Sequence, residues 1–267
     1  MSNTHTTATL HCLPGWAMQP ASWLALQQHF QQHIPSVVIQ THALPWSPVE
    51  PQDIASVALA TQCLNDMADK LAAQLPDASL VAGWSLGGQL VLNIAQRHPH
   101  KVSGFVLVAS TPKFAQAGDW QNGMPLETLL TFQQALQDNP SALLKRFCTL
   151  QALGTQPDAR ELGRQLLTLA DPRLARAIGL QLLQWLDLRP LLTQITQPCL
   201  ILHGEQDQLM PSAALPDWQK QLQHATVCRL AGCGHAPIIS HTIACASHVQ
   251  AWLEDNAFLS THSASPA

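Results

Sequence analysis

The most constraining feature of this chain is the stretch Gly83-Trp84-Ser85-Leu86-Gly87. The apolar residues 80–82 before it predict a buried strand, and residues 86–98 after it predict an amphipathic helix. A serine at such a strand-to-helix turn needs small neighbours, because the tight backbone then lets its Oγ project from the strand end. The N–H groups that open the helix point to where an oxyanion would form. The stretch therefore predicts a nucleophile elbow with Ser85 as the nucleophile.

A serine nucleophile needs a general base, and the base needs a carboxylate that orients it. In folds with this elbow the acid comes next in the sequence, on a loop after a late strand. Residues 198–204 predict a buried strand, and the polar turn that follows holds Glu205 and Asp207. We assign Asp207 as the acid, because a short side chain at the far end of the turn matches the usual pattern. Glu205 is the competing candidate.

The predicted base is His235. Residues 225–230 alternate like a strand, and the glycine-rich loop 231–237 follows them. The chain has thirteen histidines, and we expect most of them, such as His98 and His224, on the solvated surface. Position on a loop after the last strand selects His235, which completes a predicted triad with Ser85 and Asp207.

The expected oxyanion hole consists of two backbone N–H groups. One belongs to Leu86, the residue after the nucleophile, and the other to the loop after an early strand. The apolar run 8–13 leads into Pro14, Gly15 and Trp16, so we assign the second donor to Trp16. Gly15 lets the backbone turn that amide inward. The indole of Trp16 is expected in the core or the pocket. This position is compatible with a role in the oxyanion hole, because the donor is the backbone N–H and not the side chain.

Length and periodicity predict one α/β domain with an insertion. The 267 residues, 46% of them hydrophobic, can bury a sizeable core. Strand-like runs alternate with helical patterns, which predicts a mostly parallel, doubly wound sheet with helices on both faces. The expected strands are residues 8–13, 36–40, 79–84, 104–109, 199–202 and 226–230. The expected helices are residues 21–33, 53–75, 86–98, 212–223 and 242–254.

Between Thr111 and Leu192 the strand signal disappears. Proline breaks divide this helical segment into four short helices, which we expect to form a cap over Ser85. We therefore expect a hydrolase core over residues 1–111 and 192–259, a helical cap over residues 112–191, and a disordered tail over residues 260–267.

Composition also excludes several classes of protein. The polar N-terminus does not resemble a signal peptide, and no apolar run approaches the ~20 residues of a membrane span. Seven irregularly spaced cysteines indicate reduced core thiols and a cytoplasmic protein. No Cys/His spacing is typical of a metal site, and the triad chemistry needs no cofactor. The net charge of −4 and the lack of a basic, aromatic patch argue against nucleic acid as a partner.

Charge is unevenly distributed along the chain. Residues 145–189 carry seven Lys and Arg against four Asp and Glu, a net charge of +3, while the rest carries six against thirteen, a net charge of −7. A basic cap on an acidic body indicates an acidic partner or substrate that approaches the cap. Ordinary solvated helix faces are the alternative explanation.

Motifs in the core and the cap together resemble one family. They are Gly83-Trp84-Ser85-Leu86-Gly87-Gly88, Val108-Ala109-Ser110-Thr111-Pro112, Arg146-Phe147, Leu150-Gln151, Leu153-Gly154-Thr155, Asp158-Ala159-Arg160, Leu186-Asp187-Leu188-Arg189, Gly234-His235-Ala236-Pro237 and Ser240-His241. Over residues 80–253 the chain resembles the pimeloyl-[acyl-carrier protein] methyl ester esterases of biotin synthesis. The loops of the triad alone would indicate only the α/β-hydrolase superfamily, and the matches in the cap carry the closer resemblance.

The resemblance implies an α/β-hydrolase fold and a cytoplasmic, monomeric carboxylesterase that demethylates its acyl substrate on an acyl carrier protein. Carrier proteins are acidic, which gives the basic cap a partner. Arg146 and Arg160 match family positions that contact the carrier, and the neighbouring Lys145 and Arg164 are expected to add to that docking surface. Phe147 matches a pocket residue beside the acyl chain, where the side chain of Trp16 is also expected.

The chain departs from the family pattern mainly near its N-terminus. Pro14-Gly15 replaces a His-Gly pair, residues 43–47 replace a Leu-Pro-Gly-Phe-Gly stretch, and the usual first two strands are expected to be missing. A family arginine falls in a deletion between Thr155 and Asp158.

Three other functions stay open on the sequence alone. They are a lyase or carbon–carbon hydrolase acting on an anionic small molecule, like the menaquinone-pathway synthase, a broad short-chain esterase, and a non-catalytic binding module. The intact serine, acid and histidine argue against the binding module, because a binder has no need of all three.

Overall fold

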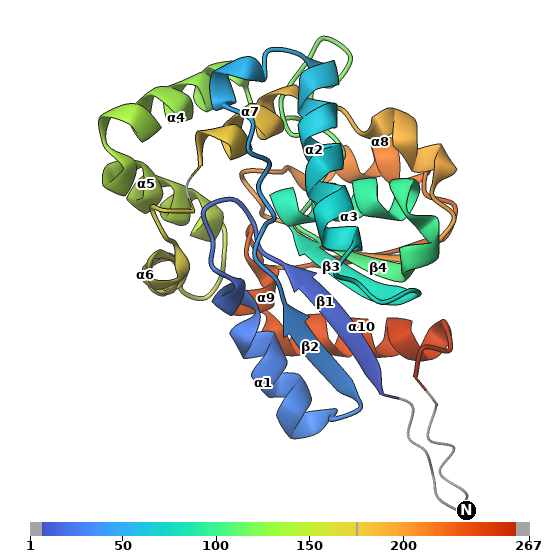
Figure 1. The fold of residues 1–267 in the computed structure, drawn as a ribbon. Helices are drawn as coiled ribbons and strands as arrows, with labels where there is room; N and C mark the ends of the chain where they lie inside the picture. The colour runs from blue at the N-terminus through green and yellow to red at the C-terminus, as the bar shows by residue number, and fades with distance from the viewer. Residues whose placement is uncertain (1–6, 175, 260–267) are drawn as a thin grey trace, which may run out of the picture.

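The structure is a computed structural model that describes residues 7–174 and 176–259. Six strands form one parallel sheet in the order β2-β1-β3-β4-β5-β6, with helices on both faces (Figure 1). The strands are β1 Ala8–Leu13, β2 Val37–Thr41, β3 Ser79–Trp84, β4 Val102–Val108, β5 Cys199–Gly204 and β6 Ala225–Leu230. The predicted α/β fold is confirmed. The predicted disordered tail, residues 260–267, lies outside the described residues.

The sheet is buried because helices cover both of its faces. On one face lie α1 (Leu24–His33), α9 (Pro237–Ser240) and α10 (Thr242–Asp255), which pack on one hydrophobic cluster. On the other lie α2 (Val57–Ala72), α3 (Leu86–Arg97) and α8 (Leu215–Gln219), which pack on a second cluster. Every residue of β3 and β5 is buried, as expected for the central strands of a covered parallel sheet.

In its described residues, the chain between β4 and β5 forms four α-helices beyond the carboxyl ends of the strands (Figure 1). They are α4 (Leu126–Asp138), α5 (Pro140–Ala152), α6 (Ala159–Leu169) and α7 (Ala177–Trp185). Local capping fixes two of their starts, since Asn139 accepts a hydrogen bond from Ala142 N and Asp158 accepts one from Glu161 N. We propose that residues 112–191 act as a cap over the strand ends, and "the cap" below denotes these residues.

Two helices differ from the sequence-based expectation. Helix α2 begins at Val57 rather than near Asp53, because Ser56 caps it by accepting a hydrogen bond from Leu59 N. The helix expected over residues 212–223 is reduced to α8, since the chain after it continues in tighter i to i+3 turns from Gln221 N to Trp218 O and from Leu222 N to Gln219 O.

All seven cysteines are free thiols, and six of them are buried, as their irregular spacing and apolar neighbours predicted. Within residues 7–174 and 176–259, no helix has both the length and the apolar character needed to cross a bilayer.

Candidate active site

Ser85 lies between β3 and α3 in the strained conformation of a nucleophile elbow, with φ 56° and ψ −119°. Its N–H donates to Val108 O at 2.9 Å, and Ser110 Oγ donates to the Ser85 carbonyl at 2.8 Å, so the carboxyl end of the neighbouring strand β4 holds the turn. A Cβ at Gly83 would overlap the backbone of Gly87, which explains why the elbow needs a glycine there. The local geometry therefore fits the sequence-based expectation for this turn.

Asp207 lies on the turn after β5 with 3% of its surface exposed. Its Oδ1 accepts hydrogen bonds from Leu209 N and Met210 N, each at 2.9 Å, and its Oδ2 accepts one from His235 Nδ1 at 2.8 Å. Burial alone raises the pKa of this carboxyl group. Its contacts with His235, the nearby His203 and the Met210 N–H outweigh burial and hold the pKa below its usual range. Asp207 is thus held as a carboxylate.

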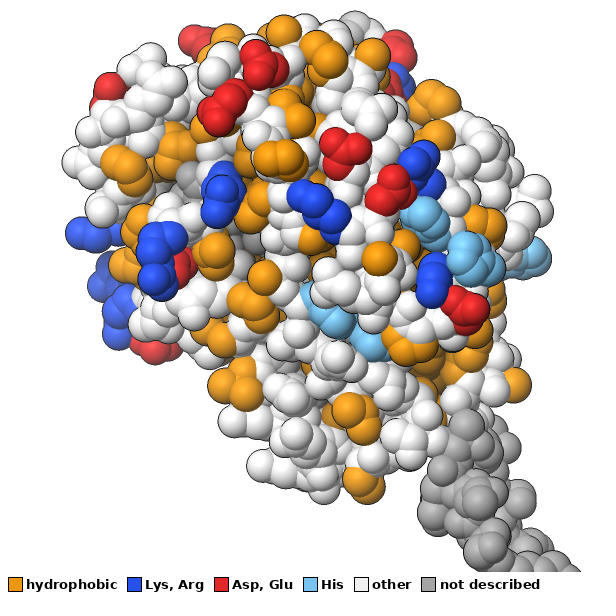
Figure 2. All heavy atoms as spheres, viewed as in Figure 1, with side chains coloured by type: hydrophobic (Ala, Val, Ile, Leu, Met, Phe, Trp, Pro, Cys, Tyr) orange, Lys and Arg blue, Asp and Glu red, His pale blue; other side chains and the backbone are white. Residues whose placement is uncertain are grey.

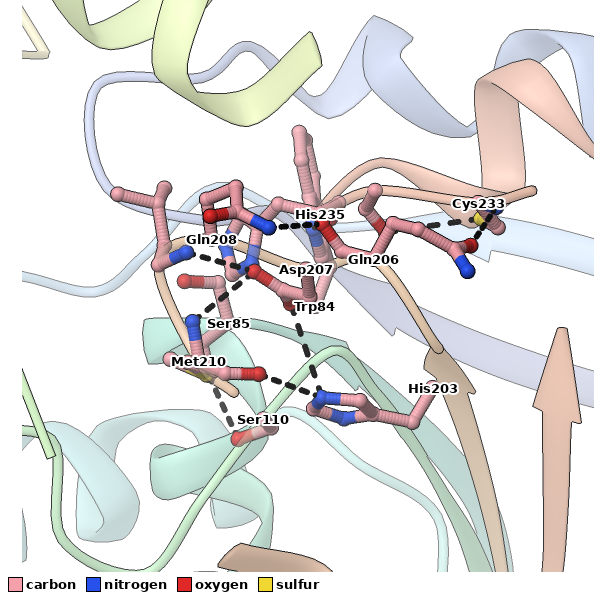
Figure 3. Close-up of polar contacts among 12 residues, drawn as sticks. Trp84, Ser85, Ser110, His203, Gln206, Asp207, Gln208, Met210, Cys233 and His235 are labelled. Carbon is pink, nitrogen blue, oxygen red and sulfur yellow. Dashed lines mark hydrogen bonds and ion pairs between the residues drawn. The ribbon is translucent and has the colours of Figure 1, made fainter. Parts of the chain in front are cut away.

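His235 lies on the loop after β6 and is 1% exposed. Its N–H donates to Gln151 O at 3.0 Å, and its carbonyl accepts a hydrogen bond from Trp84 Nε1 at 2.8 Å. Figure 3 shows Ser85, Asp207 and His235 gathered in one cluster at the strand ends. Glu205, the competing acid, is exposed on the same turn, whereas Asp207 contacts the imidazole, and this arrangement favours Asp207 as the acid.

The two proposed oxyanion donors border the nucleophile. Leu86 is the first residue of α3, and a Cβ at Gly15 would lie 3.3 Å from Ser85 Cβ, so the loop that carries Trp16 passes close to the serine. Among the described residues, the backbone N–H groups of Trp16 and Leu86 donate no hydrogen bond. The indole of Trp16 is used separately, since Nε1 donates to Arg176 O in the cap at 2.9 Å.

Aromatic and apolar side chains surround this loop. The ring of Phe147 on α5 packs edge-on against Trp16 with centroids 5.1 Å apart. A cavity of about 50 Å³ adjoins Gly15, and apolar side chains including Met18 and Trp46 line it. Trp46 comes from the stretch that departs from the family pattern. These walls suit an alkyl group better than a charged one.

Known proteins identify the family of the chain. The sequence profile described as "alpha/beta hydrolase fold" matches residues 9–242. A protein named pimeloyl-[acyl-carrier protein] methyl ester esterase from Nitrosomonas europaea is 35% identical over 253 residues, which cover 90% of this chain and 95% of that protein. Another of the same name from Aromatoleum aromaticum is 36% identical over 246 residues, covering 88% and 93%.

This chain belongs to the pimeloyl-[acyl-carrier protein] methyl ester esterase family of α/β hydrolases. The resemblance indicated by its motifs is therefore confirmed. The crystal structure of a bromoperoxidase from Bacillus anthracis is also similar, with a TM-score of 0.76 and 17% identity over 94% of this chain and 93% of that one. At that identity the likeness shows the fold alone.

The cap of this family member carries a basic groove on its outer surface. The groove, of about 430 Å³, runs between α5 and α6, and Lys145, Arg160 and Arg164 line it. Figure 2 shows Lys and Arg side chains gathered over this flank of the molecule. Leu153 and Leu167, which are 47% and 38% exposed, add apolar surface to the groove.

Two of the four cations expected to meet the carrier have partners within the protein. Arg164 Nη1 lies 2.7 Å from Glu161 Oε2. Arg146 places its guanidinium carbon 5.4 Å from the centre of the Phe132 ring, and Phe132 in turn packs edge-on against Phe147. Arg146 therefore also supports the aromatic wall beneath it, whereas Arg160 is exposed in the groove.

Sequence reasoning assigned no role in the site to His203, or to the three cap residues that form hydrogen bonds with the base loop, Gln151, Thr155 and Gln156. His203 is 2% exposed, and its Nε2 donates to Met210 O at 2.7 Å and lies 3.8 Å from Asp207 Oδ2. Burial lowers the pKa of His203. Its position four residues before Asp207, at the end of a buried strand, was the available signal. No group of three or more His, Cys, Asp or Glu in the described part of the chain is arranged to bind a metal ion.

Proposed function

We propose that this protein is a carboxylesterase that hydrolyses the methyl ester of pimeloyl-[acyl-carrier protein] in biotin synthesis, with Ser85, His235 and Asp207 as its catalytic triad. The observation that carries the proposal is the buried hydrogen bond from His235 Nδ1 to Asp207 Oδ2 beside a serine in the elbow conformation. It occurs in a chain that is 35% and 36% identical to two proteins named for this activity.

In the first half of the reaction, Ser85 Oγ attacks the carbonyl carbon of the methyl ester while its proton passes to His235 Nε2. Asp207 accepts the hydrogen bond from Nδ1, which fixes the tautomer that leaves Nε2 free to take the proton. The N–H groups of Trp16 and Leu86 stabilise the oxyanion, each supplying about 3 kcal/mol in the transition state. Collapse of the tetrahedral intermediate expels methanol, which takes the proton from His235.

In the second half, water replaces the alcohol. His235 takes a proton from the water, the hydroxide oxygen attacks the acyl carbon, and the Ser85 oxygen leaves with that proton. The products are methanol, a free carboxylate at the end of the pimeloyl chain, and regenerated enzyme. The residues present carry every proton transfer, so the mechanism needs no cofactor.

The basic groove fits an acidic carrier protein. We propose that Arg146, Arg160, Lys145 and Arg164 meet acidic side chains of the carrier, while its prosthetic arm passes the acyl chain towards Phe147 and Ser85. Charge supports this, since residues 145–189 are net +3 on a protein that is net −4. The apolar surface of Leu153 and Leu167 gives the carrier a place to pack among the charges.

Mass spectrometry of the carrier tests the proposed function. Purified protein is incubated with pimeloyl methyl ester attached to an acyl carrier protein, and the carrier is expected to lose the mass of one CH₂ group. The Ser85→Ala variant is the matched control and should leave the carrier unchanged. Expression in a strain that requires biotin because it lacks its own methyl ester esterase should restore growth without biotin. An unchanged carrier mass with wild-type protein would refute the assigned substrate.

A further inference from the structure

The loop that carries His235 is bound to the cap by three hydrogen bonds. His235 N donates to Gln151 O at 3.0 Å, Gly234 N donates to Thr155 Oγ1 at 3.0 Å, and Gln156 N donates to Gly232 O at 2.8 Å. On the cap side, the two acceptors and the one donor all lie at or just after the C-terminal end of α5. The base loop and this end of the cap therefore form one connected unit.

Of these three contacts, only one uses a side chain. Thr155 is 6% exposed, and its Oγ1 accepts the N–H of the residue directly before His235. A Cβ on Gly234 would lie 2.7 Å from this same Oγ1 and 2.7 Å from Leu153 O, so the backbone approaches the cap too closely for any other residue. The sequence Leu153-Gly154-Thr155, to which the proposed reaction assigns no role, thus lies directly behind the base.

We propose that Thr155 is a positioning residue for the catalytic base. Its hydroxyl holds the Gly234 N–H, and this fixes the backbone from which the imidazole contacts Asp207 and on which its proposed proton transfer with Ser85 depends. The proposal rests on the proposed function only in that His235 is taken as the base. Without the hydroxyl, a buried N–H has no acceptor and the loop shifts to find one. Small displacements of a catalytic group slow the chemical step much more than they weaken substrate binding.

The same helix carries Lys145, Arg146 and Phe147 on its preceding turns. Residues proposed to meet the carrier and the acyl chain are therefore joined through one rigid element to the backbone of the base. Thr155 follows that helix by three residues and is neither among the residues that line the groove nor part of the aromatic wall. Its substitution should consequently change the rate of the chemical step and leave substrate affinity alone.

The test compares Thr155→Val, which keeps the shape and removes the hydroxyl, with Thr155→Ser, which keeps the hydroxyl. Turnover of a small methyl ester and the rate at which a fluorophosphonate labels Ser85 are measured at a temperature where circular dichroism shows every variant folded. We expect Thr155→Val to lower kcat and the labelling rate by about tenfold with KM unchanged, and Thr155→Ser to restore both. Thr168→Val is the matched control, because Thr168 is exposed on α6 and its Oγ1 donates only to Gln165 O of the same helix.

The outcomes separate this inference from the proposed function. Wild-type kcat and labelling rate in Thr155→Val would overturn the positioning role. An equal loss of kcat in Thr155→Ser, or in the control Thr168→Val, would also overturn it. Protein that labels at Ser85 and responds to Thr155→Val but leaves the carrier-linked ester intact would support the positioning role and refute the substrate. A wild-type Ser85 that no fluorophosphonate labels would overturn both.

Discussion

The acid and the base of the proposed triad are held in opposite ways. Asp207 is fixed from within its own turn, by Leu209 N, Met210 N and the bond from His203 to Met210 O, all within residues 203–210. His235 sits on a loop that forms hydrogen bonds with Trp84 and Gln206 of the core and with the cap at the end of α5. The hydrogen bonds that shape the acid turn therefore come from the turn itself, whereas the base loop is bound to core and cap together.

This difference gives the cap a second role beside the proposed one of covering the strand ends. An insertion that only covered substrate could be exchanged without touching the chemistry. Here the cap contributes Gln151 O and Thr155 Oγ1 to the backbone around the base, so changes in α5 are transmitted to His235.

The largest effect should come from the nucleophile and the base. Ser85→Ala or His235→Ala should each lower kcat by about a million-fold, because either change removes proton transfer from the serine. Steady-state hydrolysis of a small methyl ester measures this, and Ser85→Ala should also abolish fluorophosphonate labelling while the protein stays folded. Labelling that persists in Ser85→Ala would identify a different nucleophile.

Substitution of the acid Asp207 should lower kcat less than substitution of His235 and more than substitution of Glu205. Asp207→Asn should lower kcat by about ten-thousand-fold, because an amide favours the wrong imidazole tautomer. Glu205→Gln is the matched change on the same turn, and it should leave kcat near the wild-type value because the Glu205 side chain is exposed. If Glu205→Gln were the more damaging substitution, the acid would be assigned wrongly.

Removing His203 should weaken the acid turn. In His203→Leu the Met210 carbonyl loses its buried donor, which should lower the free energy of unfolding by about 2 kcal/mol. Urea unfolding followed by circular dichroism checks the value. Unfolding energies equal to wild type would show that the turn does not need this bond, and the contrast between acid and base would then rest on Leu209 N and Met210 N alone.

Charge reversal on the cap should affect carrier-linked substrate only. Arg146→Glu with Arg160→Glu should raise KM for the carrier substrate by about tenfold, since each exposed pair contributes ~0.2 to 1 kcal/mol and reversal adds repulsion. The effect should shrink at high salt. Small esters are the control, and because Arg146 also lies over Phe132, Arg160→Glu alone is the cleaner variant. If activity fell equally on carrier-linked and small esters, these arginines would stabilise the cap or bind a small anion, and the proposed docking of the carrier would be wrong.

The smallest effect should come from Asp69 and its two partners, which lie far from the acid and base loops. Arg97 and His98 hold the pKa of Asp69 at about 2 through their hydrogen bonds and charges. A depressed carboxyl pKa stabilises the fold above the unfolded value of about 3.9, and this contribution is lost as the pH falls towards 2. Because the side chains are about 40% exposed, at 41% and 44% for Arg97 and Asp69, Asp69→Asn should cost less than about 1 kcal/mol at neutral pH.

Urea unfolding of wild type and Asp69→Asn at several pH values measures this contribution. The difference between the two should be largest near neutral pH and should vanish below about pH 2. Activity on small esters should be the same for both proteins. A loss of activity in Asp69→Asn would mean that the α2 and α3 surface is coupled to the triad.

The sequence predicted the sheet and the candidate triad because their signals are local. Apolar runs mark β1, β3 and β5, and glycines beside Ser85 mark a turn that only small residues permit. The choice of Asp207 over Glu205 followed from position on one turn, and the contact with His235 agrees with it.

The contacts of the cap could not be predicted, because they join residues far apart in the chain. Thr155 and Gly234 are 79 positions apart, and Trp16 and the carbonyl of Arg176 are 160 apart. Several of the acceptors, such as Gln151 O, are backbone groups, which every residue type possesses. No residue pattern therefore distinguishes them before the chain is folded.

The central claim is that Ser85 attacks the methyl ester of a carrier-linked substrate. Acid quenching of wild-type protein mixed with an equal amount of the pimeloyl methyl ester carrier tests it directly. The account predicts a covalent adduct whose mass is the sum of protein and substrate less methanol, attached at Ser85 and missing in Ser85→Ala. Release of a free carrier thiol, which means that the thioester was cut instead, or an adduct that forms without Ser85, would contradict it.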